Sequence, residues 1–239
     1  MNLSVVIIEP RPWIDKINFL IQNVRGILGD IPIQIYCGAS SQDRINKDSN
    51  TIIRSVGKDN LTRVEYCDLA KSVSFWERID TDKILFMQTD GCLCKKSQYK
   101  VEDFYKYDYV GGYAPQAWWS KELRIANIDK NEFPYQCLNG GFSLRTTEAC
   151  KKVIETFTPR KSIEYTNYNK QTRMENIFED LFFVCGMHLL GYNVGRDKFA
   201  TNFCTHTEYV SNTFCVHNLF KYKRVNSFLE YCPEYDYIR

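Results

Sequence analysis

The chain has 239 residues, a mass of 28.1 kDa and a formal net charge of +2. This length is typical of one α/β enzyme domain, and the small net charge gives no electrostatic support for a nucleic-acid partner, so we expect none. Hydrophobic residues make up 44% of the chain and charged residues 25%, as in ordinary globular proteins, and no run approaches the roughly eighteen apolar residues of a membrane span.

The ten cysteines are predicted to be reduced thiols. An apolar run at residues 5–8 is too short for the core of a signal peptide and has no basic leader. Without an export signal, free thiols in a reducing compartment are the default, and the cysteine spacing matches no zinc motif. We therefore expect a cytoplasmic protein, located in the host cytoplasm if the chain is viral.

The first half of the chain alternates predicted strands with predicted helices. Apolar periodicity, β-branched runs and breaks at Gly or Pro define these elements. In chain order they are a strand at 3–8, a helix at 13–28, a strand at 31–37, a polar region of loops with a little structure at 40–60, a weak strand at 62–67, a helix at 69–79 and a strand at 83–88. This alternation favours an α/β fold with a mainly parallel mixed sheet and helices on both faces.

The second half is more mixed, and nothing in its composition indicates a linker. In chain order we predict a strand at 107–112, a long segment at 113–137, a short extended piece at 140–144, a helix at 147–157, a polar stretch to 172, a helix at 176–190 and an alternating segment at 199–220. We expect a single domain over 1–239, in which 1–112 mainly binds nucleotide and 113–239 mainly binds acceptor and carries the catalytic residues.

Polar residues follow two predicted strands at their carboxyl ends, where ligands bind in α/β sheets. One group is Glu9-Pro10-Arg11 and the other is Gln88-Thr89-Asp90. An acid at the end of a buried strand can ligate a divalent cation that neutralises a diphosphate. The same Asp-Gly step also suits an ordinary turn, so both interpretations stay open.

Three further motifs lie in the second half. Two glycines within residues 139–141 allow a close backbone approach to a ligand, or form a β-bulge. Glu179 and Asp180 precede an apolar helix, where acids also serve as favourable first-turn charges. His217 follows a short apolar run, and a single histidine is more often structural than a ligand. None of the three is decisive alone.

The order of these motifs resembles that of the GT-A glycosyltransferases. The chain more closely resembles an uncharacterised family from large DNA viruses, fungi and bacteria whose members are expected to be glycosyltransferases. The matching segments are Phe-Trp at 75–76, Ile-Leu-Phe-Met-Gln-Thr-Asp at 84–90, Tyr-Asp-Tyr-Val-Gly at 107–111, Asn-Gly-Gly-Phe-Ser-Leu-Arg at 139–145, Glu-Asp-Leu-Phe-Phe at 179–183, and His217. They span most of the chain, and the segment at 139–145 is the most specific.

The resemblance implies an inverting transfer of a sugar from a nucleoside diphosphate sugar to a hydroxyl of a glycan or another acceptor, assisted by Mn²⁺ or Mg²⁺. It makes Asp180 the catalytic base with Glu179 as its helper, and Asp90 and His217 the metal ligands. The donor-binding residues that follow are Glu9, Pro10, Arg11, Gln88, Thr89, Asp90, Asn139, Gly140 and Gly141, and the acceptor-binding residues are Trp118 and Trp119.

The chain departs from the better-known GT-A enzymes in one motif. They carry Asp-x-Asp where this chain has Gln88-Thr89-Asp90. The last acid of that motif is usually the direct metal ligand, so Asp90 can still serve. The missing first acid leaves open a catalytically inactive nucleotide-sugar or carbohydrate-binding module, and a structural virion protein is a further alternative. Retaining stereochemistry is also compatible with the Glu-Asp pair, and we expect the helix N-terminus to lower the pKa of Asp180.

Overall fold

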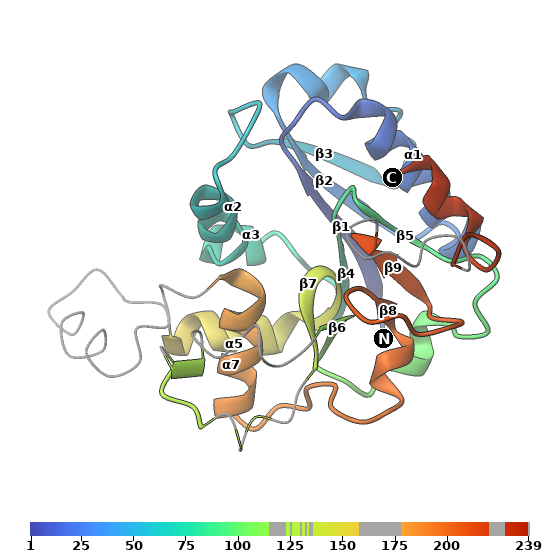
Figure 1. Cartoon of the computed structure of the whole chain (residues 1–239). Helices are drawn as coiled ribbons and strands as arrows, with labels where there is room; N and C mark the ends of the chain where they lie inside the picture. The colour runs from blue at the N-terminus through green and yellow to red at the C-terminus, as the bar shows by residue number, and fades with distance from the viewer. Residues whose placement is uncertain are drawn as a thin grey trace, which may run out of the picture.

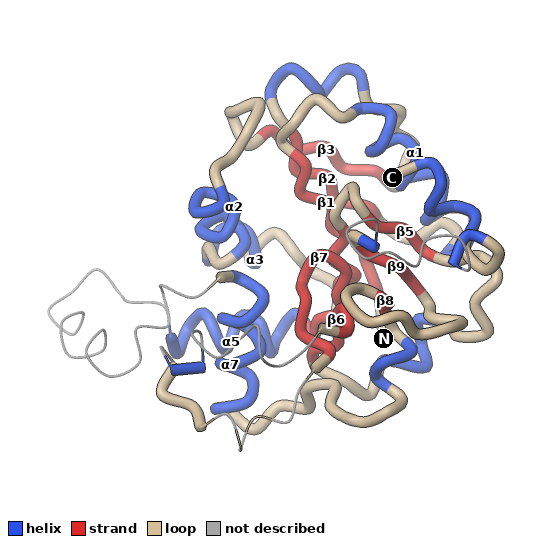
Figure 2. Tube along the Cα trace, viewed as in Figure 1, coloured by secondary structure: helices blue, strands red, loops and turns tan. Residues whose placement is uncertain are grey.

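The computed structural model describes residues 1–114, 123–124, 126–129, 131, 133, 136–157, 178–219 and 228–238. A mixed sheet with the strand order β3-β2-β1-β4-β7-β6-β8-β9-β5 runs through the molecule (Figures 1 and 2). The strands are β1 (Leu3–Glu9), β2 (Ile33–Cys37), β3 (Thr51–Ser55), β4 (Lys83–Met87), β5 (Gly91–Leu93), β6 (Tyr109–Tyr113), β7 (Cys137–Thr146), β8 (Cys204–Thr205) and β9 (Cys215–His217).

Helices cover both faces of this sheet (Figure 1). The helices are α1 (Ile14–Leu28), α2 (Arg63–Ala70), α3 (Val73–Trp76), α5 (Thr147–Phe157) and α7 (Glu179–Leu189), with short 3-10 helices that include η1 (Ala39–Arg44), η2 (Val101–Phe104), η5 (Ala200–Asn202) and η7 (Pro233–Tyr237). This mainly parallel mixed sheet between helices confirms the predicted α/β fold class. Within the described residues, no helix combines the length and apolarity that a membrane span requires.

The sheet separates two hydrophobic cores because successive side chains of a strand point to opposite faces. In β1, Val5 and Ile7 pack toward α1, whereas Val6 and Ile8 pack toward α3, α5 and α7. All four side chains are buried. A strand buried on both faces reads as a continuous apolar run, which is why residues 3–8 could be assigned from the sequence.

Strand directions bring distant parts of the chain to one edge of the sheet. β1 is parallel to both β2 and β4, so these three strands end at the same edge. β7 runs antiparallel to β4 with Phe142 opposite Met87, and the Gln88 amide donates to the carbonyl of Gly141 at 2.8 Å. Residues 139–141 therefore arrive beside the end of β4.

The last strands to join the sheet bring His217 to the same edge. β9 is antiparallel to β5, and His217 is the register partner of Gly91. The Asn218 amide also donates to the carbonyl of Asp90 at 2.8 Å. Asp90 and His217 are thus neighbours across a β-ladder.

The predicted strand at 62–67 is wrong, because this segment begins helix α2. Thr62 caps the helix: its hydroxyl accepts from the Glu65 amide at 3.2 Å, and the Glu65 carboxylate accepts from the Thr62 amide at 2.8 Å. This reciprocal pair is a capping box, which satisfies backbone donors at the start of a helix. Besides β1, the strand that pairs in parallel with β2 is instead β3, which lies inside the stretch 40–60, where the sequence predicts loops with a little structure.

The segment at 140–144 is extended as predicted, but it is the middle of a longer strand, the ten-residue β7. Its glycines interrupt the apolar pattern that identifies a strand. All ten cysteines lie in the described residues, and each is buried and free of a disulfide.

Candidate active site

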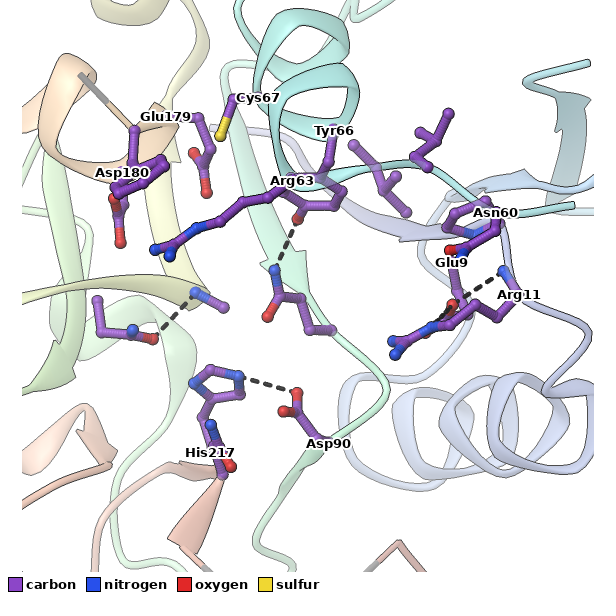
Figure 3. Close-up of a pocket in the computed structure, with 18 residues that line it drawn as sticks. Glu9, Arg11, Asn60, Arg63, Tyr66, Cys67, Asp90, Glu179, Asp180 and His217 are labelled. Atoms are coloured by element: carbon purple, nitrogen blue, oxygen red, sulfur yellow. Dashed lines mark hydrogen bonds and ion pairs between the residues drawn. The ribbon is translucent and has the colours of Figure 1, made fainter. Parts of the chain in front are cut away.

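A pocket of about 400 Å³ opens at the carboxyl ends of β1 and β4 (Figure 3). Its walls come from the segment after β1, the start of α2, β7, the start of α7 and β9. The predicted site residues that line it are Glu9, Pro10, Arg11, Gln88, Asp90, Asn139, Gly141, Glu179, Asp180 and His217. Thr89 and Gly140 lie behind this lining, and Trp118 and Trp119 fall outside the described residues.

Asp90 and His217 form a polar pair on one wall of the pocket. The carboxylate oxygen Oδ1 of Asp90 lies 2.9 Å from Nε2 of His217. His217 is buried, whereas the Asp90 side chain keeps 27% of its surface exposed. A buried ring nitrogen and a partly exposed carboxylate therefore point to the same part of the cavity.

The donor atoms of this pair fit a divalent cation. Two ligands on adjacent corners of an octahedral ion lie about 3 Å apart when each bond is about 2.1 Å, close to the observed 2.9 Å. Among the residues that the structure describes, no cluster of three or more His, Cys, Asp or Glu side chains is arranged to hold a metal. A cation bound at this pair would take two ligands from the described residues, and substrate oxygens and water would complete its shell, as is usual for Mg²⁺.

Glu9 is committed to contacts within the protein. Arg11 donates from Nε to one carboxylate oxygen and from Nη2 to the other, both at 2.7 Å. Thr89 donates its hydroxyl hydrogen to Glu9 from the neighbouring strand end. The Arg11 guanidinium also lies 3.5 Å from the centroid of the Trp13 ring. These contacts neutralise Glu9 and fix the side chains at the end of β1.

A buried ion pair underlies the opposite wall. Arg145 donates from Nη1 to a Glu179 carboxylate oxygen at 2.8 Å, and both side chains are almost completely buried. Arg145 also donates from Nε to the Ser143 hydroxyl at 2.8 Å and from Nη2 to the Gly140 carbonyl at 3.3 Å. Glu179 therefore serves mainly to balance a buried guanidinium, whereas Asp180 forms no ion pair with any residue in the described part of the chain.

Asp180 lies at the start of α7 and faces the pocket. Its carboxylate accepts from the Leu181 amide at 2.8 Å and more loosely from the Gly140 amide at 3.4 Å. Burial, reinforced by the charge of Glu179, raises the pKa of Asp180 to about 6. The expected lowering of this pKa by the helix terminus is therefore wrong, because desolvation outweighs the backbone hydrogen bonds.

The two glycines of β7 make room for side chains of the site. A Cβ atom on Gly141 would lie 2.1 Å from Cε1 and 2.3 Å from Nε2 of His217. A Cβ atom on Gly140 would lie within 2.8 Å of Arg145, Asp180 and Glu179 atoms. The absence of side chains at these positions lets both walls of the pocket close on β7.

The sequence interpretation missed the wall formed by α2. Tyr66 accepts a hydrogen bond from the Gln88 side-chain amide at 2.8 Å, and Asn60, Leu61 and Arg63 also line the cavity. The capping box at the start of α2 could have revealed this helix, because Thr-x-x-Glu is a recognised N-terminal pattern. The sequence places Arg145 in the motif at 139–145, but its buried ion pair with Glu179 is evident only in the three-dimensional structure.

Comparison with solved structures shows a glycosyltransferase fold. The chain is similar to the galactosyltransferase LgtC in complex with donor and acceptor sugar analogues, with a TM-score of 0.54 and 11% identity over 90% of this chain and 86% of that chain. It is also similar to mouse xyloside xylosyltransferase 1 in its apo form, with a TM-score of 0.54 and 7% identity over 91% of this chain and 98% of that chain. These likenesses establish the GT-A-like architecture.

Sequence comparisons are less informative about activity. No curated protein matches the chain. One family model matches residues 52–217, which include the pocket lining except for residues 8–11 and Asn218. The match covers more than half of the chain, so the chain belongs to the family described as "Protein of unknown function (DUF5672)".

Proposed function

We propose that the protein is a glycosyltransferase that moves a sugar from a nucleoside diphosphate sugar to a hydroxyl acceptor, with inversion. The observation that carries the proposal is the position of Asp180 in the same pocket as the Asp90–His217 pair. An acid that can take a proton and a pair that fits a cation for a diphosphate are the two groups that this transfer needs. The GT-A-like fold of the described residues supports the same activity.

Each wall of the pocket has a part in the proposed reaction. Asp90 and His217 would hold a divalent cation, Mn²⁺ or Mg²⁺, which when bound neutralises charge on the donor diphosphate. Glu9, Pro10 and Arg11 would contact the nucleoside. Asp180 would accept the proton of the acceptor hydroxyl as its oxygen attacks the sugar carbon.

The glycines and the buried ion pair would act by positioning. Arg145 and Glu179 hold the start of α7 against β7, and thereby fix Asp180 relative to Asn139 and Gly141. A base held in attack geometry is more effective than its basicity alone suggests, because proximity lowers the entropic cost of the reaction.

The direct test is a screen of nucleotide sugars for donor hydrolysis, with Mn²⁺, with Mg²⁺ and with a chelator. We expect hydrolysis of at least one donor, and we expect Asp90→Ala to weaken metal-dependent binding of the matching nucleoside diphosphate in calorimetry. Asp80→Asn, which alters an exposed acid outside the pocket, is the control. Binding of a nucleotide sugar with no turnover under any condition would instead favour the inactive binding module.

A further inference from the structure

Among the charged residues that line the pocket, one cation has no ion-pair partner within the described part of the chain. Glu9 is paired with Arg11, and Glu179 with the buried Arg145. The other charged residues of the lining are Asp90, Asp180 and Arg63. Asp90 faces His217, and Asp180 accepts hydrogen bonds from backbone amides.

Arg63 is held by stacking and not by a counter-ion. Its guanidinium carbon lies 3.5 Å from the centroid of the Phe178 ring, directly before Glu179 and Asp180 in the chain. No hydrogen bond or ion pair joins its side chain to any residue in the described part of the chain. A guanidinium that stacks on a ring keeps its N–H groups free for a planar, bidentate interaction with an oxyanion.

Figure 3 shows how the two cations are distributed. Arg63 extends from α2 toward the side of the pocket that holds Asp180, and Arg11 lies on the other side with Glu9 and Asn60. Arg11 already uses two of its donors on Glu9, whereas Arg63 retains its full set. Arg63 is therefore the cation that is free to meet an anion near the reacting centre.

We propose that Arg63 binds the β-phosphate of the nucleoside diphosphate as it leaves, as a fixed cation besides the metal ion. This inference rests on the proposed function. In the transfer, the bond between the sugar carbon and the β-phosphate oxygen breaks and its electron pair stays on that oxygen. The acceptor oxygen forms the new bond to the sugar carbon, and its proton passes to Asp180.

The leaving diphosphate thus gains one negative charge in a pocket whose other acids are already paired or needed for proton transfer. A preorganised cation aimed at developing charge lowers the barrier, because it needs no rearrangement when the charge appears. Arg63, whose exposed side chain rests on the Phe178 ring at the start of α2, is placed to supply such a cation. Its effect should be larger on the nucleoside diphosphate than on the intact nucleotide sugar, whose β-phosphate carries less charge.

Calorimetry on matched ligands tests the proposal. The nucleoside diphosphate that wild-type protein binds most tightly from a panel with uracil, guanine, adenine, cytosine and thymine bases is chosen first, in the presence of Mn²⁺. Its affinity is then compared with that of the corresponding monophosphate in wild type, Arg63→Gln, Arg63→Lys and the control Arg196→Gln. Arg196 is an exposed arginine outside the pocket.

We expect Arg63→Gln to weaken diphosphate binding by about tenfold to a hundredfold, the range for a hydrogen bond to a charged group, and to change monophosphate binding far less. Arg63→Lys should fall between, since it keeps the charge but loses the planar fork. Donor hydrolysis should decrease in parallel, because the nucleoside diphosphate is the leaving group in that reaction too. Water is then the acceptor and carries no anionic group, so the decrease could not come from a lost contact between Arg63 and the acceptor. Arg196→Gln should behave as wild type, and thermal unfolding should show that Arg63→Gln is folded.

Several outcomes would overturn the assignment of Arg63. Unchanged diphosphate affinity in Arg63→Gln would do so, as would an equal loss for the monophosphate. Normal donor hydrolysis combined with a defect toward acidic acceptors alone would assign Arg63 to the acceptor instead. If wild-type protein binds no nucleoside diphosphate, the proposed function fails together with this inference. The three results above would contradict only the role of Arg63 and would leave the proposed function intact.

Discussion

Two adjacent carboxylates at the start of α7 have different surroundings and therefore different chemistry. Glu179 points to the buried guanidinium of Arg145, which balances its charge. Asp180, which is half-buried, accepts hydrogen bonds from backbone amides and lies beside the charge of Glu179. A carboxylate with a raised pKa is a stronger base than one in water, so the same environment that makes Asp180 costly to ionise also suits it to accept a proton.

We predict that Asp180→Asn lowers turnover by about two to four orders of magnitude, the usual contribution of a positioned general base. Donor affinity should hardly change, because the base contacts the acceptor. In wild type, kcat/KM should rise with pH through about 6 and level off above it, because the base of the free enzyme must be ionised. Steady-state kinetics across pH, with calorimetry of the donor, measure these effects.

Product analysis by NMR separates the two parts of that prediction. Turnover that survives in Asp180→Asn would contradict the base assignment. Retention of the anomeric configuration would contradict inversion even if Asp180 proved essential.

The buried side chain of Arg145 should contribute strongly to the stability of the fold, because it balances the charge of Glu179. Arg145→Met leaves Glu179 buried without a partner, and we expect the free energy of unfolding to fall by about 3–5 kcal/mol. Adding Glu179→Gln should recover part of this loss, because the unpaired charge is removed. Urea unfolding of both variants and of wild type measures the difference, and an equal loss in the two variants would mean that the ion pair is not the cause.

At the scale of elements, β7 is the common support of both walls. Its backbone contacts β4 on one side and β6 on the other, and its glycines admit His217 from one direction and the Arg145–Glu179 pair from the other. A strand with this role needs small residues where the walls meet and apolar residues elsewhere. Residues 139–145 combine the two, with Gly140 and Gly141 where the walls meet and Phe142 and Leu144 in the hydrophobic core.

We predict that Gly141→Ala disrupts metal-dependent binding while most of the fold survives. The added methyl group would overlap the His217 ring, so the imidazole must turn away from Asp90. Calorimetry should show weaker binding of a nucleoside diphosphate with Mn²⁺ but little change without the metal. Gly26→Ala is the matched control, because a Cβ atom at that glycine meets no other atom within 4 Å. Full metal-dependent affinity in Gly141→Ala would argue against the role of His217.

The sequence predicts elements best where one physical cause dominates. β1, β4 and the helix at 147–157 are confirmed because apolar periodicity and burial agree there. β3 was missed because it alternates buried, exposed and half-buried residues within a polar stretch. α2 was assigned as a strand because its apolar residues are few, and its start depends on the local Thr62–Glu65 hydrogen bonds.

The candidate site shows the same limit. The sequence predicts that residues at the ends of parallel strands lie close together, since the carboxyl ends of such strands share one edge of the sheet. The partners of Glu9 and Glu179, and the contribution of α2, depend on packing between segments far apart in the chain. Single-sequence patterns carry no information on such pairs.

At the scale of the whole molecule, the pocket draws on both predicted halves. Glu9, Arg11, Gln88 and Asp90 come from residues 1–112, whereas Asn139, Asp180 and His217 come from 113–239. The division into a nucleotide-binding half and a catalytic half stays a prediction, but neither half contains the described pocket alone.

We predict that all ten thiols are free but slow to react in the folded protein. All ten thiols are buried, which keeps reagents away from them, and burial raises the pKa of Cys37 and Cys67 to about 11, so these two carry little reactive thiolate near neutral pH. Titration with a thiol reagent should count few groups in native protein and close to ten in denaturant without reductant. A denatured count well below ten that reductant restores would reveal disulfides and contradict the expectation of a reducing compartment.

The pairing of β5 with β9 also determines at which stage of chain synthesis the Asp90–His217 pair can form. Asp90 and His217 are separated by 127 positions in the chain, and in the described sheet β5 has β9 as its neighbour. During synthesis, which proceeds from the N-terminus, the end of β4 and its acid are made long before the strand that completes the pair. A nascent or truncated chain that stops before β9 would therefore carry Asp180 and the α2 wall without a complete cation pair, so that activity would begin only when the last strand has entered the sheet.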